Sequence, residues 1–126
     1  MSGERLLLDT NAIVALLKGS ADLSMLTSGA SWIGISVISE LEFLCFPRLS
    51  NADETCFRRL LERVEVIGLG AEDVELTEAA IRIRKEHALR IPDAIIGATA
   101  QVHGAILVTA DTDFSRVPDL PIHSFA

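Results

Sequence analysis

The fold is decided by the stretch Leu6-Leu7-Leu8-Asp9-Thr10-Asn11 near the start of the chain. Three leucines bounded by polar residues are typical of a short strand that is buried on both faces. An apolar run over residues 12–17 follows, with no turn signal before Gly19, and predicts a helix. Asp9 therefore lies at the carboxyl end of a buried strand, where ligands bind in open α/β sheets. A carboxylate there is costly unless a cation compensates its charge.

Strand-like and helix-like segments alternate along the remaining chain. Strands are predicted over residues 5–9, 32–37, 64–69, 105–109 and 120–125. Helices are predicted over residues 10–18, 21–28, 38–46, 51–64, 71–89 and 94–103, and residues 91–93 open the last of them. This alternation predicts an α/β fold, with a mostly parallel sheet of four to five strands between two helical layers. The length of 126 residues fits one domain over residues 1–126.

The composition is that of a compact globular domain, with 49% hydrophobic and 23% charged residues. No run of eighteen apolar residues occurs, so we expect no membrane span. The first residues lack the pattern of a signal peptide. Cys45 and Cys56 have no metal-type spacing, and we expect buried, reduced thiols. Together these features predict a cytoplasmic protein.

Acidic side chains follow the predicted strands or open the predicted helices at three further places, namely Glu40, Asp93 and Asp111. Because the carboxyl ends of parallel strands meet at one edge of a sheet, we expect these acids to converge with Asp9. Glu42 is expected to be solvated, because it lies two residues further along its helix and points elsewhere. Asp93 and Asp111 are also typical helix-start residues, which is the alternative interpretation.

A cluster of carboxylates raises its own pKa values by mutual repulsion unless a cation is bound. Oxygen ligands alone favour a hard ion, Mg²⁺ or Mn²⁺. Zinc is disfavoured, because the nearest His or Cys candidates, His87 and His103, lie on neighbouring helices.

The segments that carry the acids are Leu7–Asn11, Ser36–Leu41, Ile91–Ala100 and Leu107–Phe114. In this order, and over essentially the whole chain, they resemble the four motifs of PIN-domain nucleases, and most closely those of VapC-type toxins. The resemblance implies a PIN-like three-layer fold and a metal-dependent ribonuclease. Asp9, Glu40, Asp93 and Asp111 would then hold one or two Mg²⁺ or Mn²⁺ ions. Hydrolysis by a metal-activated water would leave 5′-phosphate and 3′-hydroxyl ends.

Other residues receive supporting roles from the same resemblance. The residues expected to orient a ligand or a water are Asp113, Thr109 and either Asn11 or Thr10. Local turn capping explains these residues equally well. The candidates for contact with RNA phosphates are Arg82, Arg84, Lys85 and Arg90. A homodimer and an antitoxin partner are implied, with a basic antitoxin tail in the acidic groove. The net charge of −7 suits such a partner and is unusual for an RNA-binding protein.

Other functions fit the sequence less well. A receiver domain needs adjacent acids after its first strand and a late lysine, but Thr10 follows Asp9 and no lysine follows Lys85. A haloacid-dehalogenase-like phosphatase needs an acid where Asn11 stands. A PIN-like module that binds RNA or protein without cleaving it is the remaining alternative, and the complete set of acids argues against it.

Overall fold

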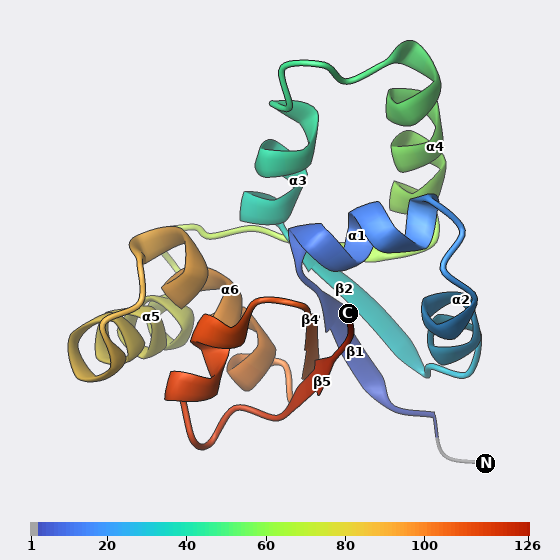
Figure 1. The fold of residues 1–126 in the computed structure, drawn as a ribbon. Coiled ribbons are helices and arrows are strands. Elements are labelled where there is room, and N and C mark those ends of the chain that lie inside the picture. Colours follow the sequence, from blue (N-terminus) through green and yellow to red (C-terminus); the bar gives the residue numbers. More distant parts are fainter. Residues whose placement is uncertain (1–2) are drawn as a thin grey trace.

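The computed structural model describes residues 3–126 and contains one five-stranded sheet (Figure 1). Its elements, in chain order, are β1 (Arg5–Leu8), α1 (Thr10–Leu17), α2 (Ala21–Ser28), β2 (Trp32–Ser36), α3 (Val37–Leu44), α4 (Asn51–Leu61), β3 (Glu65–Ile67), α5 (Val74–His87), α6 (Ile91–Val102), β4 (Ile106–Thr109), the 3-10 helix η1 (Thr112–Arg116) and β5 (Ile122–Ser124). The strands lie in the order β3-β2-β1-β4-β5, and every neighbouring pair is parallel. The predicted α/β fold is confirmed.

The three leucines of β1 supply side chains to both faces of the sheet, because successive residues of a strand point to opposite sides. Leu7 packs into a core with residues of α5, α6 and η1. Leu6 and Leu8 belong to a second core with residues of α1, α2, α3 and α4. All three leucines are at most 1% exposed. The central strand is thus buried between two helical layers, which Figure 1 shows on opposite sides of the sheet.

The order in which the chain adds strands to the sheet changes direction at β1. Within the sheet, β2 and β3 lie between β1 and one edge, and β4 and β5 lie between β1 and the other edge. In parallel sheets such a reversal leaves a crevice at the carboxyl ends of the two central strands. Leu8 is paired with Val108, so Asp9 and Thr109 leave the sheet next to each other. The topology therefore places the ends of β1 and β4 at the expected ligand-binding position.

The ends of several helices differ from the predicted ends for local reasons. The Ser36 hydroxyl accepts a hydrogen bond from Ile38 N, so α3 begins at Val37, one residue earlier than predicted. Helix α5 ends at His87, because Ala88 adopts a left-handed conformation with φ of 57°. Ala88 is the only non-glycine residue with positive φ among residues 3–126. It starts the short connection that leads to α6.

The prediction of buried cysteines is wrong, since Cys45 and Cys56 are both exposed free thiols. Cys45 follows the last turn of α3. Cys56 lies on α4, a helix in which only Phe57 is buried. In residues 3–126, no helix is both long enough and apolar enough to cross a membrane.

Candidate active site

Asp9 is held at the end of β1 by donors to both of its carboxylate oxygens. Thr10 N donates to Oδ1 at 2.8 Å, and the Thr109 hydroxyl donates to Oδ2 at 2.7 Å. Asn11 Nδ2 adds a longer contact to Oδ2 at 3.3 Å. Asp9 is only 6% exposed, and this burial raises its pKa, while the hydrogen bonds from Thr109 and Thr10 oppose the shift. These donors thus fix the orientation of the Asp9 carboxylate.

The same polar groups join the end of β4 to the start of α1. The Thr109 hydroxyl also accepts a hydrogen bond from Asp111 N at 3.0 Å. Asn11 Oδ1 accepts one from Ala110 N at 3.0 Å. The structure therefore brings Thr109 and Asn11 into contact with Asp9, at the positions expected of supporting residues. The Thr10 hydroxyl donates to a different acid of the site, Glu42.

Asp93 and Asp111 reach the site from two other elements. Asp93 lies in the first turn of α6, is 7% exposed, and accepts a hydrogen bond from Arg90 Nε at 3.2 Å. Asp111 caps η1 by accepting a hydrogen bond from Asp113 N at 2.9 Å. Asp113 itself is exposed and pairs with Arg116 at 3.4 Å, so it lies at the edge of the site.

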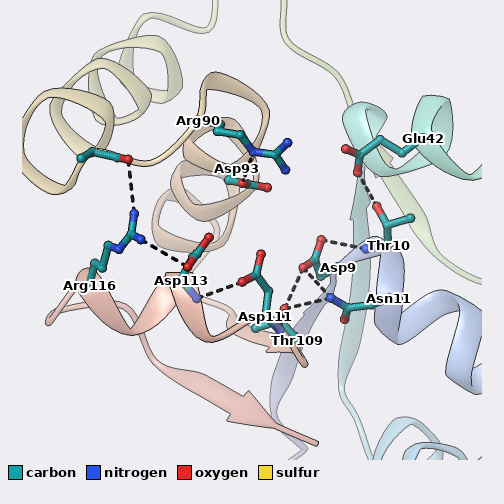
Figure 2. A network of polar contacts seen from close by, with 11 residues as sticks. Asp9, Thr10, Asn11, Glu42, Arg90, Asp93, Thr109, Asp111, Asp113 and Arg116 are labelled. Carbon is teal, nitrogen blue, oxygen red and sulfur yellow. Dashed lines mark hydrogen bonds and ion pairs between the residues drawn. The ribbon is translucent and has the colours of Figure 1, made fainter. Parts of the chain in front are cut away.

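Glu42, and not Glu40, is the α3 residue that faces the other acids. Glu42 Oε1 accepts a hydrogen bond from the Thr10 hydroxyl at 2.6 Å. Its charge raises the pKa values of Asp9 and Asp93. Figure 2 shows Glu42 directed toward the region between Asp9 and Asp93. Glu40 makes no hydrogen bond or ion pair within residues 3–126. The contact between Glu42 and Thr10 shows that the prediction that Glu42 points away is wrong.

The reason for this error is the geometry of α3. Ser39 and Phe43 are its buried residues, and Leu41 is 56% exposed on the opposite side. Glu40 and Glu42 flank that exposed position about 100° to either side, so the sequence pattern treats them alike. The packing of α3 beside α1 decides between them, because it brings Thr10 to the Glu42 side.

The charges of neighbouring acids add to the raised pKa values of the two buried ones, and those of Asp93 and Glu42 act on Asp9. Burial is the largest cause of the raised pKa of Asp93, and the charges of Asp111 and Glu42 add to it. Arg90 opposes the shift. All donor atoms of this set are carboxylate oxygens, which suits a hard divalent cation. Among residues 3–126, however, no three acidic, His or Cys side chains form a preformed metal cage.

The predicted RNA-contacting residues lie at different places. Arg90 reaches the acids, as Figure 2 shows. Arg82 instead lines a cleft with Glu78, Gln101 and Asp119, which the sequence did not indicate. Arg84 and Lys85 are exposed on α5 and make no polar side-chain contact within the described residues.

Arg116 also lies near the acid site. Its spacing of three residues from Asp113, which brings two side chains to one face of a helix, is the sequence signal that could have identified this pair. It donates to Asp113 Oδ1 and to the backbone oxygen of Ala88, both at 3.4 Å. Arg116 thus links η1 to the connection that precedes α6.

Comparisons with known proteins agree with this geometry. A family model described as "PIN domain" matches residues 6–120. The chain is 30% identical to "Ribonuclease VapC4" of Mycobacterium tuberculosis (strain ATCC 25618 / H37Rv) over 132 residues, which cover 97% of this chain and 98% of that protein.

Solved structures with the same fold include a "Toxin-antitoxin complex from Klebsiella pneumoniae", with a TM-score of 0.77, 28% identity, and coverage of 94% of this chain and 96% of that chain. A second is VapBC2 from Rickettsia felis bound to a DNA fragment from its promoter, with a TM-score of 0.78, 24% identity, and coverage of 96% and 98%. The family model spans most of the chain, and the VapC4 relative spans nearly all of it. The chain therefore belongs to the PIN-domain family and is a relative of the VapC ribonucleases.

Proposed function

We propose that this protein is a Mg²⁺- or Mn²⁺-dependent endoribonuclease and the toxin of a toxin–antitoxin pair. The observation that carries the proposal is the meeting of Asp9, Glu42, Asp93 and Asp111 at the crevice between β1 and β4. Two of these acids are buried, and burial raises their pKa values. Membership of the PIN-domain family and the VapC4 relative support the reaction class.

The four carboxylates would hold the cation, with Glu42 in the role that the sequence pattern predicts for Glu40. A divalent ion bound there would neutralise a substrate phosphate, lower the pKa of an attacking water and stabilise the leaving oxygen. The chain's own contribution is orientation. Thr109, Asn11 and Thr10 N fix the Asp9 carboxylate, and the Thr10 hydroxyl fixes Glu42.

A ribonuclease toxin acts on cellular RNA, so we place its action in the cytoplasm.

An antitoxin with a basic tail is the partner that this site suits. An arginine entering the crevice would form charge-assisted hydrogen bonds with the acids and oppose metal binding. The net charge of −7 favours such a peptide, and the Klebsiella pneumoniae structure is a toxin–antitoxin complex.

We also propose a homodimer. Val74 and Ile81 are 57% and 49% exposed, two turns apart on one face of α5, and provide apolar surface for a second copy.

The deciding experiment is an RNA cleavage assay on antitoxin-free protein with Mg²⁺, Mn²⁺ or EDTA, comparing the native chain with Asp9→Asn. We expect cleavage by the native chain with metal, products with 5′-phosphate ends, and loss of cleavage in the variant. Equal cleavage by both proteins, or RNA binding by the native chain without any cleavage, would refute the proposal. The second outcome would support the non-cleaving module instead.

A further inference from the structure

Arg90 is the cation that lies at the mouth of the acid site. It precedes α6, and its side chain is 78% exposed. Its Nε donates to Asp93 Oδ2 at 3.2 Å, while its two terminal nitrogens make no hydrogen bond within residues 3–126. Figure 2 shows the guanidinium beside the Asp93 carboxylate. Arg90 therefore occupies one carboxylate and keeps donor groups available for another partner.

The surrounding charges show that Arg90 belongs to the whole site. Its hydrogen bond and ion pair with Asp93 raise the pKa of the guanidinium, and the charges of Glu42 and Asp111 add to this effect. These acids come from α6, from α3 and from the segment after β4. A single exposed arginine thus balances carboxylates from three separate elements.

Arg90 is not needed to start α6. The start of the helix uses the backbone oxygen of Arg90, which accepts a hydrogen bond from Ala94 N at 2.8 Å. The side chain makes no capping hydrogen bond. Pro92 in the first turn further favours helix initiation. Any role of the guanidinium therefore lies in its interaction with the acids.

We propose that Arg90 is an exchangeable counter-ion, which pairs with Asp93 in the metal-free site and turns to an RNA phosphate when a divalent cation binds. This inference rests on the proposed function. A divalent cation at Asp93 would repel the guanidinium over a short distance. The Arg90 side of this pair can exchange partners, because the side chain is 78% exposed and water competes for its donor groups. The unpaired terminal nitrogens suit bidentate binding of a phosphate.

The proposal predicts effects of opposite sign on two ligands. Arg90→Ala removes the competitor at Asp93, so the Kd for Mn²⁺ alone should fall about two- to fivefold in titration calorimetry. The same variant loses a phosphate contact, so the KM for RNA should rise about tenfold with a smaller change in kcat. Arg90→Lys keeps the positive charge and should keep the Mn²⁺ affinity close to native. Its point charge should restore only part of the RNA affinity.

Arg58→Ala is the control, because it removes an arginine from an ion pair on a different helix, with Glu54 on α4. It should leave both constants at native values. Weaker or unchanged Mn²⁺ binding by Arg90→Ala, or an unchanged KM, would overturn the inference while native cleavage remains. If the native protein neither binds Mn²⁺ nor cleaves RNA, the proposed function fails and the inference fails with it.

Discussion

Thr109→Val should destabilise the metal-free protein more than any comparable loss of a buried hydroxyl. Thr109 is 1% exposed, and its hydroxyl donates to Asp9 Oδ2 at 2.7 Å while accepting from Asp111 N at 3.0 Å. Valine fills nearly the same volume, so packing changes little. The variant therefore removes the hydrogen bonds of the hydroxyl, including the shortest side-chain donor to Asp9, with little change in packing.

The magnitude follows from those two contacts. A hydrogen bond to a charged group contributes about 1.5–3 kcal/mol, and the loss of the acceptor for Asp111 N adds about 1 kcal/mol. We expect a loss of about 2.5–4 kcal/mol in the free energy of unfolding. Thr99→Val is the matched control, because Thr99 is also 1% exposed but donates to the neutral backbone oxygen of Ile95 at 2.7 Å. It should lose about 1 kcal/mol or less.

Urea unfolding at pH 7.5 with EDTA measures both variants, and Asp9→Asn completes a double-mutant cycle with Thr109→Val. The coupling energy should be at least about 0.5 kcal/mol, because the two groups are in direct contact. A loss no larger than that of Thr99→Val, or a coupling energy near zero, would refute the reasoning. It would mean that Thr109 is a packing residue and does not stabilise the Asp9 carboxylate.

Three further predictions concern the acids and the connection before α6. Glu42→Gln should lower cleavage about 10- to 100-fold while Glu40→Gln stays near native, and the reverse order in steady-state kinetics would contradict the assignment. Ala88→Gly should stabilise the protein by about 1 kcal/mol in urea unfolding, because glycine adopts positive φ without strain; a loss of stability would contradict this. Burial raises the pKa values of Asp9 and Asp93 above 3.8, so the metal-free folded state retains protons that the unfolded state releases. Its stability should therefore fall as pH rises between 3.8 and the raised values, less steeply in Asp9→Asn, and equal slopes would contradict the assignment.

The sequence predicted the fold because its strongest signals are local and agree with one another. A fully apolar strand can only be central, and β1 is central. Each later strand is separated from the one before by a segment long enough to cross over, which leads to parallel pairing. The strand order β3-β2-β1-β4-β5 was not predictable in this way, since it depends on which edge each crossover joins.

The site was predictable where a residue's position is fixed by the end of a strand or the start of a helix. Asp9, Asp93 and Asp111 satisfy that condition, and the structure brings them together. Glu42 and Arg82 do not, because they lie within helices whose orientation is set by packing. The error between Glu40 and Glu42 has this cause, and so does the unpredicted position of Arg82 in a separate cleft. The exposed Cys45 and Cys56 show that a thiol's residue type does not determine its burial.

The acidity of the chain is consistent with RNA cleavage once charges are counted at the site. Both arginines near the acids are paired three residues along the chain, Arg90 with Asp93 and Arg116 with Asp113. In the metal-free protein these pairs cancel the positive charge that RNA would need. On the proposed function, a bound divalent cation would offset two of the negative charges and release Arg90, which makes the site less negative. On the same proposal, the net charge of −7 would favour RNA binding when metal is bound, because phosphates are repelled by uncompensated carboxylates.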